Sequence, residues 1–292
     1  MPGYVGRFAP TPSGPLHFGS LIAASASFLD AKSHRGQWLV RVDDIDTPRV
    51  VPGASNQILE QLVDYGFEWD GEVVYQSDRL QSYHAALDLL RSKHLTYACS
   101  CSRKQVLQRC NTTVYDGFCR QKNQRFTAQN SERFKLSDAC LMFVDIFQGQ
   151  QQLDTKAELG DFILKRSDGF FAYHLVCAVD DLNQGVTHVI RGYDLIQSTF
   201  AQIELTKALS GVTLQYGHHP LVFNPQKIKY SKSANSPPIT KQNLKENLIL
   251  MLKFLNQSPP DDLAAAEVGE IWQWAIQHWQ RDKVARSEGF QP

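Results

Sequence analysis

Two stretches of the chain carry side chains that could hold the phosphates of a nucleotide. The first covers residues 3–20, where a loop rich in proline, serine and glycine leads directly into His17 and Gly19. A histidine there can donate a hydrogen bond to charge that builds on a transferring phosphate, and a glycine lets a ligand approach the backbone. The second covers residues 229–233 (KYSKS), whose two lysines could bind phosphates as point charges. Taken alone, the first could equally be a packed helix start and the second a solvated loop.

The residues around the first stretch predict a strand, a loop and a helix, in that order. Residues 4–9 are short and apolar like a buried strand, and the prolines that follow exclude regular structure. Apolar side chains then repeat at helical spacing to about His34. Ser13 is a candidate N-cap, Pro15 suits the first turn, and Gly36 is a candidate left-handed stop. Such a helix N-terminus is a ready anion site, because free N–H groups and the helix dipole point the same way.

Helices and strands alternate along most of the chain, which predicts an α/β fold with a doubly wound parallel sheet of the Rossmann type. Further strands are expected at residues 38–42, 73–76, 186–191 and 219–223, and helices at 58–65, 80–90 (capped by Ser77 or Asp78) and 195–209. The alternation breaks at Cys99, and in residues 99–154 only 141–147 is a convincing strand, before a hairpin signal at 167–169. We expect residues 1–98 and 186–240 to form two halves of one nucleotide-binding domain, with an insertion at 99–185 and a small helical C-terminal region at 241–292.

Composition limits the class of protein but does not choose a partner. The 292 residues are 42% hydrophobic, which is ample for a core, and the formal net charge is zero. Nucleic acid is therefore neither required nor excluded, and any binding would depend on a local patch. No apolar run reaches membrane-spanning length, and no secretory signal is recognisable, so we expect a cytoplasmic protein. In that reducing compartment clustered cysteines bind metal more often than they pair.

Five motifs, in order along the chain, resemble those of the class I aminoacyl-tRNA synthetases. PTPSGPLHFGS and KYSKS are similar to the two signature motifs of that family, usually written HIGH and KMSKS. Residues 7–14 (RFAPTPSG) resemble the opening of its glutamyl- and glutaminyl-type branch. Residues 41–46 (RVDDID) and 191–195 (RGYDL) resemble the R-x-E-D-x-D and R-G-x-D-L elements of the same branch.

The resemblance implies activation of L-glutamate by ATP with Mg²⁺, giving glutamyl-adenylate and pyrophosphate. His17 and Lys232 would be catalytic by stabilising the phosphates, and the ATP-binding set would be His17, Gly19, Ser20, Lys229, Ser231 and Lys232. The glutamate-binding set would be Arg7, Phe8, Ala9, Pro10, Thr11, Asp43, Tyr173 and Arg191. In that set Arg7 and Arg191 are the candidates for the side-chain carboxylate, and Asp43 for the α-ammonium group. Tyr173 could instead belong to the core, and Asp44 and Asp46 are expected to cap the next turn.

Three positions depart from the family pattern. Ser20 stands where the first signature motif has its second histidine, which weakens one phosphate donor. Tyr230 replaces the methionine of the second motif, which is a conservative packing change. Asp43 stands where the family has glutamate and is one methylene shorter, so the ammonium contact would be water-bridged or the pocket would be shifted.

The chain is also similar to a group of shortened proteins within this branch. That resemblance implies an acceptor other than the 3′ end of a tRNA. The chain ends soon after KYSKS, too soon for the large anticodon-binding region of a full synthetase. The acceptor implied is queuosine, the modified base in the anticodon stem-loop of tRNA(Asp), and the enzyme would act as a monomer. Basic residues of the insertion could contact phosphates or form an ordinary solvated surface: Arg103, Lys104, Arg109, Arg120, Lys122 and Arg125.

A cysteine cluster in the insertion resembles the zinc element of that group. The resemblance implies structural Zn²⁺ held by Cys99, Cys101, Tyr115 and Cys119, and three thiolates with one further ligand do form closed tetrahedral sites. The alternatives are a surface loop of free thiols, or a site in which Cys110 replaces Tyr115. The two remaining cysteines, Cys140 and Cys177, lie in apolar stretches and are expected to be buried.

Three other functions remain open at this point. The chain could be a glutamyl-tRNA synthetase that charges a tRNA 3′ end. It could be a nucleotidyltransferase of the same superfamily, although RGYDL and the two glutamate-site arginines argue against that. It could also be a non-catalytic, zinc-containing RNA-binding protein, against which the intact PTPSG and KYSKS motifs argue.

Overall fold

The computed structural model describes residues 3–223 and 237–291, and its centre is a set of parallel strands. Strands β1 (Val5–Phe8), β2 (Gln37–Val42) and β3 (Val74–Tyr75) pair in parallel, in that order. Strands β9 (His188–Gly192) and β10 (Gln215–His219) form a second parallel pair. The two pairings meet where the backbone N–H of Thr187 donates to the carbonyl of Val5 at 2.9 Å. The predicted α/β fold with parallel strands is confirmed.

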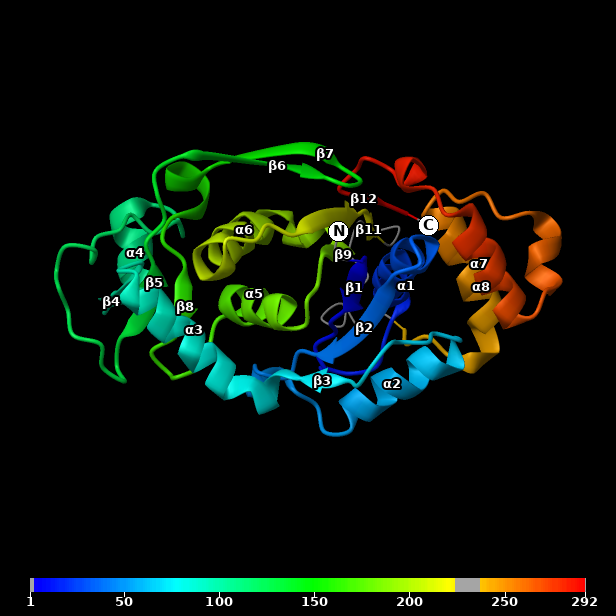
Figure 1. Ribbon diagram of the computed structural model, residues 1–292, viewed down its shortest axis with the longest axis horizontal. Helices are drawn as coiled ribbons and strands as arrows, with labels where there is room; N and C mark the ends of the chain where they lie inside the picture. The colour runs from blue at the N-terminus through cyan, green and yellow to red at the C-terminus, as the bar shows by residue number, and fades with distance from the viewer. Residues whose placement is uncertain (1–2, 224–236, 292) are drawn as a thin grey trace.

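Helices cover both faces of these strands, as Figure 1 shows with α1 on one face and α5 and α6 on the other. The central helices are α1 (Phe18–Ser33), α2 (Ala54–Asp64), α3 (Leu80–Ser92), α5 (Tyr173–Asn183) and α6 (Ile196–Ser210). One core joins α1 to β1, β2 and the C-terminal helices, and a second joins α3, α5 and α6. Both cores are dominated by leucine, isoleucine, valine and aromatic side chains, whose burial drives the packing.

Several predicted helix ends are wrong. The N-cap of α1 is His17, whose side chain accepts from the backbone N–H of Ser20, so Ser13 and Pro15 lie outside the helix. The left-handed residue after α1 is Arg35 (φ 54°) and not Gly36. Gly36 serves packing instead, because a Cβ there would lie 2.5 Å from the carbonyl oxygen of Tyr4. Helix α3 follows a 3₁₀ turn, so its N-cap is Arg79.

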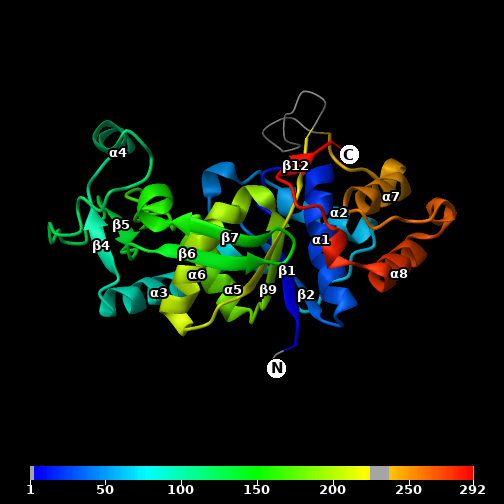
Figure 2. The same ribbon diagram turned by 90° about the horizontal axis from the view of Figure 1, so that it is seen from above.

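Residues 96–165 contain more strands than the sequence indicates, and the first of these strands begins before the expected insertion limit at 99. Strands β4 (Thr96–Cys99), β5 (Ser131–Phe134) and β8 (Ile163–Lys165) form an antiparallel sheet, and α4 (Arg103–Cys110) follows β4. Strands β6 (Cys140–Asp145) and β7 (Gly149–Asp154) form a hairpin that lies over α6, as Figures 1 and 2 both show. One strand was expected in 99–154, because β5 and β7 are too polar to show alternation. The predicted turn at 167–169 is confirmed by a bond of 2.8 Å from the N–H of Arg166 to the carbonyl of Phe170.

The C-terminal part packs against α1 at the opposite end of the molecule from the insertion (Figure 1). Helices α7 (Leu244–Phe254) and α8 (Val268–His278) lie in this part, where helices were expected. The strand expected at 219–223 is interrupted at Pro220, which lacks an N–H and separates the end of β10 at His219 from β11 (Leu221–Val222). Strand β11 pairs with β12 (Gly289–Phe290). The domain limits at 99, 186 and 241 stay predictions.

Short helical turns connect these elements. They are η1 (Thr47–Arg49), η2 (Gln76–Arg79), η4 (Tyr193–Leu195), η6 (Lys241–Asn243), η7 (Asp261–Ala265), η8 (Arg281–Lys283) and the π-turn η3 (Thr155–Leu159). None of the helices in the described part of the chain has the length and apolar character needed to span a bilayer.

Candidate active site

A cleft of about 160 Å³ lies at the carboxyl ends of the parallel strands, where open α/β sheets bind their ligands. Its lining comes from the start of α1, the end of β9 and the segment after β10: His17, Gly19, Ser20, Ala23, Gly192, Asp194, His219, Pro220, Leu221 and Val222. His17, Gly19 and Ser20, three of the predicted ATP-binding residues, are therefore together. The cleft faces the N-terminus of α1, whose free N–H groups and dipole favour an anion.

His17 is fixed at this cleft by its own helix. Its Nδ1 accepts from the backbone N–H of Ser20 at 3.3 Å, and its Nε2 lies 3.2 Å from the Ser20 hydroxyl. Across the cleft, a Cβ at Gly192 would lie 2.8 Å from Oδ1 of Asp194, so any larger residue there would have to displace the Asp194 side chain. The serine at position 20 therefore contacts the histidine of the motif directly.

Lys229, Ser231 and Lys232 lie outside the described residues. The chain before and after them is described, and both of its ends reach this cleft. Val222 lines the cleft, while Pro238 forms a bridge with His17 and the N–H of Ile239 donates to the carbonyl of Leu16 at 2.9 Å.

Arg191, at the end of β9, is buried with an exposed fraction of 5%. Its Nε donates to Nε2 of His218 at 3.2 Å and one terminal nitrogen to the Thr199 hydroxyl at 2.7 Å. The other terminal nitrogen lies 3.4 Å from the hydroxyl of Tyr173. Within the described residues none of its hydrogen bonds reaches a carboxylate. A buried guanidinium in this state favours binding of an anionic ligand, and its planar fork matches a carboxylate.

Tyr173, the first residue of α5, is not a core residue. Its exposed fraction is 37%, and its hydroxyl is the one that meets Arg191. Desolvation around the phenol, joined by the neighbouring Cys177, raises the pKa of Tyr173, so the hydroxyl stays neutral at physiological pH. The core alternative for Tyr173 is wrong, because the side chain faces the site beside Arg191.

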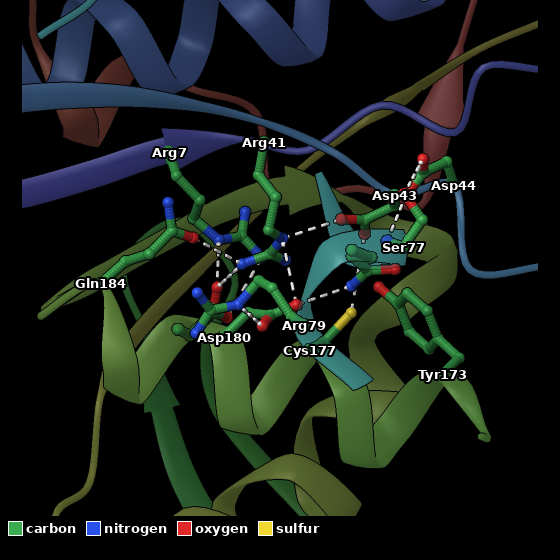
Figure 3. A network of polar contacts seen from close by, with 12 residues as sticks. Arg7, Arg41, Asp43, Asp44, Ser77, Arg79, Tyr173, Cys177, Asp180 and Gln184 are labelled. Atoms are coloured by element: carbon green, nitrogen blue, oxygen red, sulfur yellow. Dashed lines mark hydrogen bonds and ion pairs between the residues drawn. The ribbon is translucent and has the colours of Figure 1, made fainter. Parts of the chain in front are cut away.

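Arg7 and Asp43 belong to a buried network of charges between β1, β2 and α5 (Figure 3). Arg7 donates from Nε to Oδ1 of Asp181 at 3.1 Å, and Arg41 donates from a terminal nitrogen to the same atom at 2.7 Å. Arg41 also donates from Nε to Oδ1 of Asp43 at 2.8 Å. Both predicted ligand residues are thus already paired with charges of the protein itself.

The environment of Asp43 bears on its departure from the family glutamate. Burial raises the pKa of Asp43, and the Arg41 guanidinium acts in the opposite direction without outweighing it. The second carboxylate oxygen of Asp43 lies 3.8 Å from the Cys177 sulfur. The short side chain is therefore held against Arg41, which lies two residues earlier on β2.

The loop after β1 is tied to the end of β2. The N–H of Asp43 donates to the carbonyl of Pro10 at 3.0 Å, which holds the Ala9–Thr11 segment beside the network. Phe8 differs, because its ring is buried and stacks on Trp38, so any contact from Phe8 to a ligand would come from its backbone. The two acids after Asp43 are not equivalent. Asp44 accepts from the backbone N–H and the hydroxyl of Ser77. Asp46 stands at the N-cap position of η1, but its side chain pairs with Arg49 and does not make the expected capping bond.

Some residues of the site were not identified from sequence. Asp180 and Asp181 were missed, although two adjacent acids in the apolar run of α5 signal a buried, paired position. Thr199 and His218 were missed as well, because each looks ordinary until the fold places it beside Arg191. Asp145 was missed because it reaches Arg191 only through His218.

The cysteine cluster lies at the far end of the insertion. The sulfurs of Cys99, Cys101 and Cys119 lie within 4.8 Å of one another, and those of Cys101 and Cys119 are 3.6 Å apart. The Tyr115 hydroxyl lies 3.3 Å from the Cys99 sulfur and 3.6 Å from that of Cys101. Tetrahedral zinc implies sulfur–sulfur distances of about 3.8 Å and sulfur–oxygen distances of about 3.5 Å, so the donor set fits.

The other cysteines behave differently from one another. Cys110 is not among the three sulfurs that lie together, so the structure favours Tyr115 over it as the fourth donor. Cys177 is buried as expected. Cys140 is exposed, because it lies on the face of β6 that points to solvent. The expectation that Cys140 is buried is therefore wrong.

Comparison with known proteins gives a consistent set of similarities. Residues 4–257 match the family described as tRNA synthetases class I (E and Q), catalytic domain. A Glutamyl-Q tRNA(Asp) synthetase of Dechloromonas aromatica is 42% identical over 289 residues, covering 97% of this chain and 96% of the relative. A Pseudomonas aeruginosa protein of the same name is 44% identical over 283 residues, covering 97% and 96%.

Two solved structures share the fold at greater distance. A glutamate-tRNA synthetase from Elizabethkingia anophelis has a TM-score of 0.81 at 25% identity, covering 98% of this chain and 67% of that one. A glutamate tRNA ligase from Elizabethkingia meningosepticum, in complex with its amino acid, has a TM-score of 0.82 at 25% identity, covering 98% and 66%. The chain thus spans about two thirds of the length of these longer proteins.

Proposed function

The chain belongs to the class I tRNA synthetases of the E and Q type, and from this we propose that it activates L-glutamate with ATP and transfers it to queuosine in tRNA(Asp). The enzyme is a ligase of the aminoacyl-tRNA synthetase type. Its relatives that carry the Glutamyl-Q tRNA(Asp) synthetase name match it along nearly their whole length, which supports this acceptor over a tRNA 3′ end.

The observation that carries the glutamate assignment is Arg191. Its buried guanidinium meets only uncharged groups of the described protein and lies beside the partly exposed Tyr173. A substrate carboxylate would supply the missing negative charge through a charge-assisted hydrogen bond. Because the Arg7 guanidinium is already paired with Asp181, Arg191 is the principal contact for the side-chain carboxylate, and Arg7 helps to shape the site.

Asp43 would then act on the α-ammonium group as part of the buried network rather than as a free carboxylate. Its pairing with Arg41 leaves the oxygen that faces Cys177 for the substrate, which suits a contact through water. Pro10, Thr11 and Ala9 would add backbone groups from the loop that is tied to β2.

ATP would bind in the cleft at the start of α1, with its Mg²⁺ as part of the substrate. Gly19 and Gly192 leave space for the nucleoside, and His17 with Ser20 would face the phosphates. The glutamate carboxylate would attack the α-phosphate in line, with catalysis by positioning and charge stabilisation. By motif match, Lys232 would add a second charge, with Lys229 and Ser231 supporting it.

Zinc would be held by Cys99, Cys101, Cys119 and Tyr115 in a structural role. When bound, the ion would tie the end of β4 to the loop that follows α4. The chain itself prepares the phenol as a ligand, since the N–H of Cys119 donates to its oxygen at 3.0 Å and the Arg133 guanidinium lies 3.8 Å from its ring centre. We further propose that the enzyme is a monomer of the cytoplasm, where its six cysteines would stay out of disulfides.

Two assays with the full chain test the proposed function. Glutamate-dependent ATP–pyrophosphate exchange should occur without any RNA, and its absence would contradict adenylate formation as described. Labelled glutamate should then be transferred to tRNA(Asp) that contains queuosine and not to the same tRNA without it. Labelling of tRNA(Glu) instead would identify a synthetase that charges a 3′ end.

A further inference from the structure

Arg191 is the end of a chain of hydrogen bonds that begins at a buried carboxylate. Oδ2 of Asp145, at the end of β6, lies 2.5 Å from Nδ1 of His218 on β10. Nε2 of the same imidazole lies 3.2 Å from Nε of Arg191, which is its register partner on β9. The Thr199 hydroxyl of α6 contacts both Arg191 and His218, at 2.7 Å and 3.1 Å.

The donors and acceptors in this series of hydrogen bonds allow a single arrangement of protons. A guanidinium can only donate, so Nε2 of His218 must present a lone pair to Arg191. An ionised carboxylate can only accept, so Nδ1 of His218 must carry the proton toward Asp145. His218 is therefore neutral, with its proton on Nδ1. An imidazolium would place an N–H against the N–H of Arg191.

We propose that Asp145 and His218 are positioning residues for the glutamate substrate, acting by holding Arg191 through a neutral acceptor. The assignment depends on the proposed function, because it concerns how Arg191 receives the side-chain carboxylate. A neutral partner fixes the planar group of Arg191 without cancelling its charge. An aspartate in the same place would fix the group equally well and would compete with the substrate carboxylate.

The electrostatics of the pair agree with this proton arrangement. Burial lowers the pKa of His218, and the Arg191 guanidinium adds to the effect, while Asp145 opposes it without reversing it. Burial works to raise the pKa of Asp145, but the hydrogen bond from His218 and those from backbone N–H groups hold that pKa below its usual value. Neutral His218 beside ionised Asp145 is the result.

The hydrogen bonds of the other carboxylate oxygen of Asp145 determine how an amide would be oriented at this position. Oδ1 accepts from the backbone N–H groups of Phe147 and Gln148, both at 2.9 Å, and of His218 at 3.1 Å. In Asp145→Asn the amide oxygen must stay with these donors, so its NH₂ must face Nδ1 of His218. The imidazole is then forced to carry its proton on Nε2, where it opposes the N–H of Arg191.

Steady-state ATP–pyrophosphate exchange separates this role from a general structural one. In Asp145→Asn we expect the KM for glutamate to rise roughly tenfold to a hundredfold, the range for loss of one hydrogen bond to a charged group, with the KM for ATP unchanged. In His218→Asn the short amide keeps a donor for Asp145 but does not bring an acceptor to Arg191, so the KM for glutamate should rise as in Asp145→Asn. His218→Gln, which returns an acceptor to Arg191, should recover part of the loss.

The matched control is His188→Gln, a histidine of the same strand pair that stacks on Tyr4 at the other end of β9. It should keep the wild-type KM for glutamate. A folded Asp145→Asn variant with a wild-type KM for glutamate would overturn the inference, as would equal losses in His218→Asn and His218→Gln. A wild-type enzyme without glutamate-dependent exchange would overturn the proposed function itself, and the inference with it.

Side-chain ¹⁵N resonances of histidine give a second readout that needs no activity. In the wild-type protein at neutral pH we expect His218 to carry its proton on Nδ1 alone, and in Asp145→Asn on Nε2 alone. The His218→Asn spectrum assigns the signal. A doubly protonated His218, or a wild-type proton on Nε2, would overturn the inference even if the variants fold poorly.

Discussion

Arg7 donates from Nε to Asp181 at 3.1 Å, and both side chains are buried. Arg191 lies on the neighbouring strand and is equally buried, but all of its hydrogen bonds within the described chain go to uncharged groups. The charge of one arginine is thus balanced by the protein, and that of the other is left for a ligand. This difference predicts opposite effects on stability when each arginine is replaced.

Arg7→Met should lower the free energy of unfolding by about 3–5 kcal/mol, because it leaves the Asp181 carboxylate buried with one partner fewer. Arg191→Met should leave that free energy unchanged or raise it, since it removes a buried charge without a countercharge. The same Arg191 variant should lose glutamate-dependent exchange. Urea unfolding of both variants beside the wild type measures the difference. An Arg191 variant as unstable as the Arg7 variant would contradict the unequal pairing.

A second prediction concerns the bond between the C-terminal part and α1. Asp30, buried on α1, accepts from the indole N–H of Trp279 at 2.9 Å and from Nε of Arg281 at 2.6 Å. Burial works to raise the pKa of Asp30, but the hydrogen bonds and charge of Arg281 hold that pKa below its usual value. Asp30→Asn should therefore destabilise the protein at neutral pH, by about 2–3 kcal/mol for a hydrogen-bonded charge.

The pH dependence of that difference has a definite sign. Because the folded-state pKa of Asp30 is depressed, its contribution is fully present above the ordinary aspartate pKa, near 4, and is lost as the pH falls through the folded-state value. The gap between wild type and Asp30→Asn, measured by urea unfolding, should shrink as the pH falls below about 4. Asp88→Asn, which removes an exposed ion pair on α3, should show a small gap throughout. A gap for Asp30 that grows in acid would contradict this.

A third prediction tests the cysteine cluster. Cys101→Ser should reduce bound zinc to well below one equivalent and destabilise the insertion, because three sulfurs and the Tyr115 oxygen form the proposed donor set. Cys110→Ser is the matched control and should keep its zinc. Metal content of both purified proteins, with thermal unfolding before and after chelation, measures the effect. Stoichiometric zinc in Cys101→Ser, or its loss in Cys110→Ser, would contradict the ligand assignment.

The sequence predicted the fold well where side-chain patterning carries the information. The parallel strands and the helices around them follow from alternating apolar segments, as β1, α1 and α6 show. The hairpin β6–β7 was half missed, because β7 (GQQQLD) is held by backbone pairing and exposes polar side chains. The cap of α1 was misplaced because local preference favours Ser13 and Pro15 as the start of a helix, whereas the N-cap is His17.

The residues of the site were predicted from the sequence, but the ion pairs among them were not. Motif order places Arg7, Asp43 and Arg191 near one another, and the structure brings each to the strand ends. The order of the motifs could not show that Asp181 pairs with Arg7, because α5 lies against β1 only in the folded chain. His218 carried no signal either, since its importance depends on register with Arg191 across two strands.

The last prediction concerns the space at Gly192, which lines the cleft opposite His17. A Cβ at this position would lie 2.8 Å from Oδ1 of Asp194 and 3.1 Å from a methyl group of Leu221, both of which also line the cleft. Gly192→Ala should therefore move these side chains into the space that we assign to ATP, and raise the KM for ATP roughly tenfold, an energy of about 1.4 kcal/mol. The KM for glutamate should change less, because Arg191 keeps its contacts to His218 and Thr199. Gly269→Ala in α8, where an added Cβ meets nothing within 4 Å, is the control and should leave both constants unchanged. A Gly192→Ala enzyme that binds ATP normally but glutamate poorly would contradict the placement of the nucleotide in this cleft.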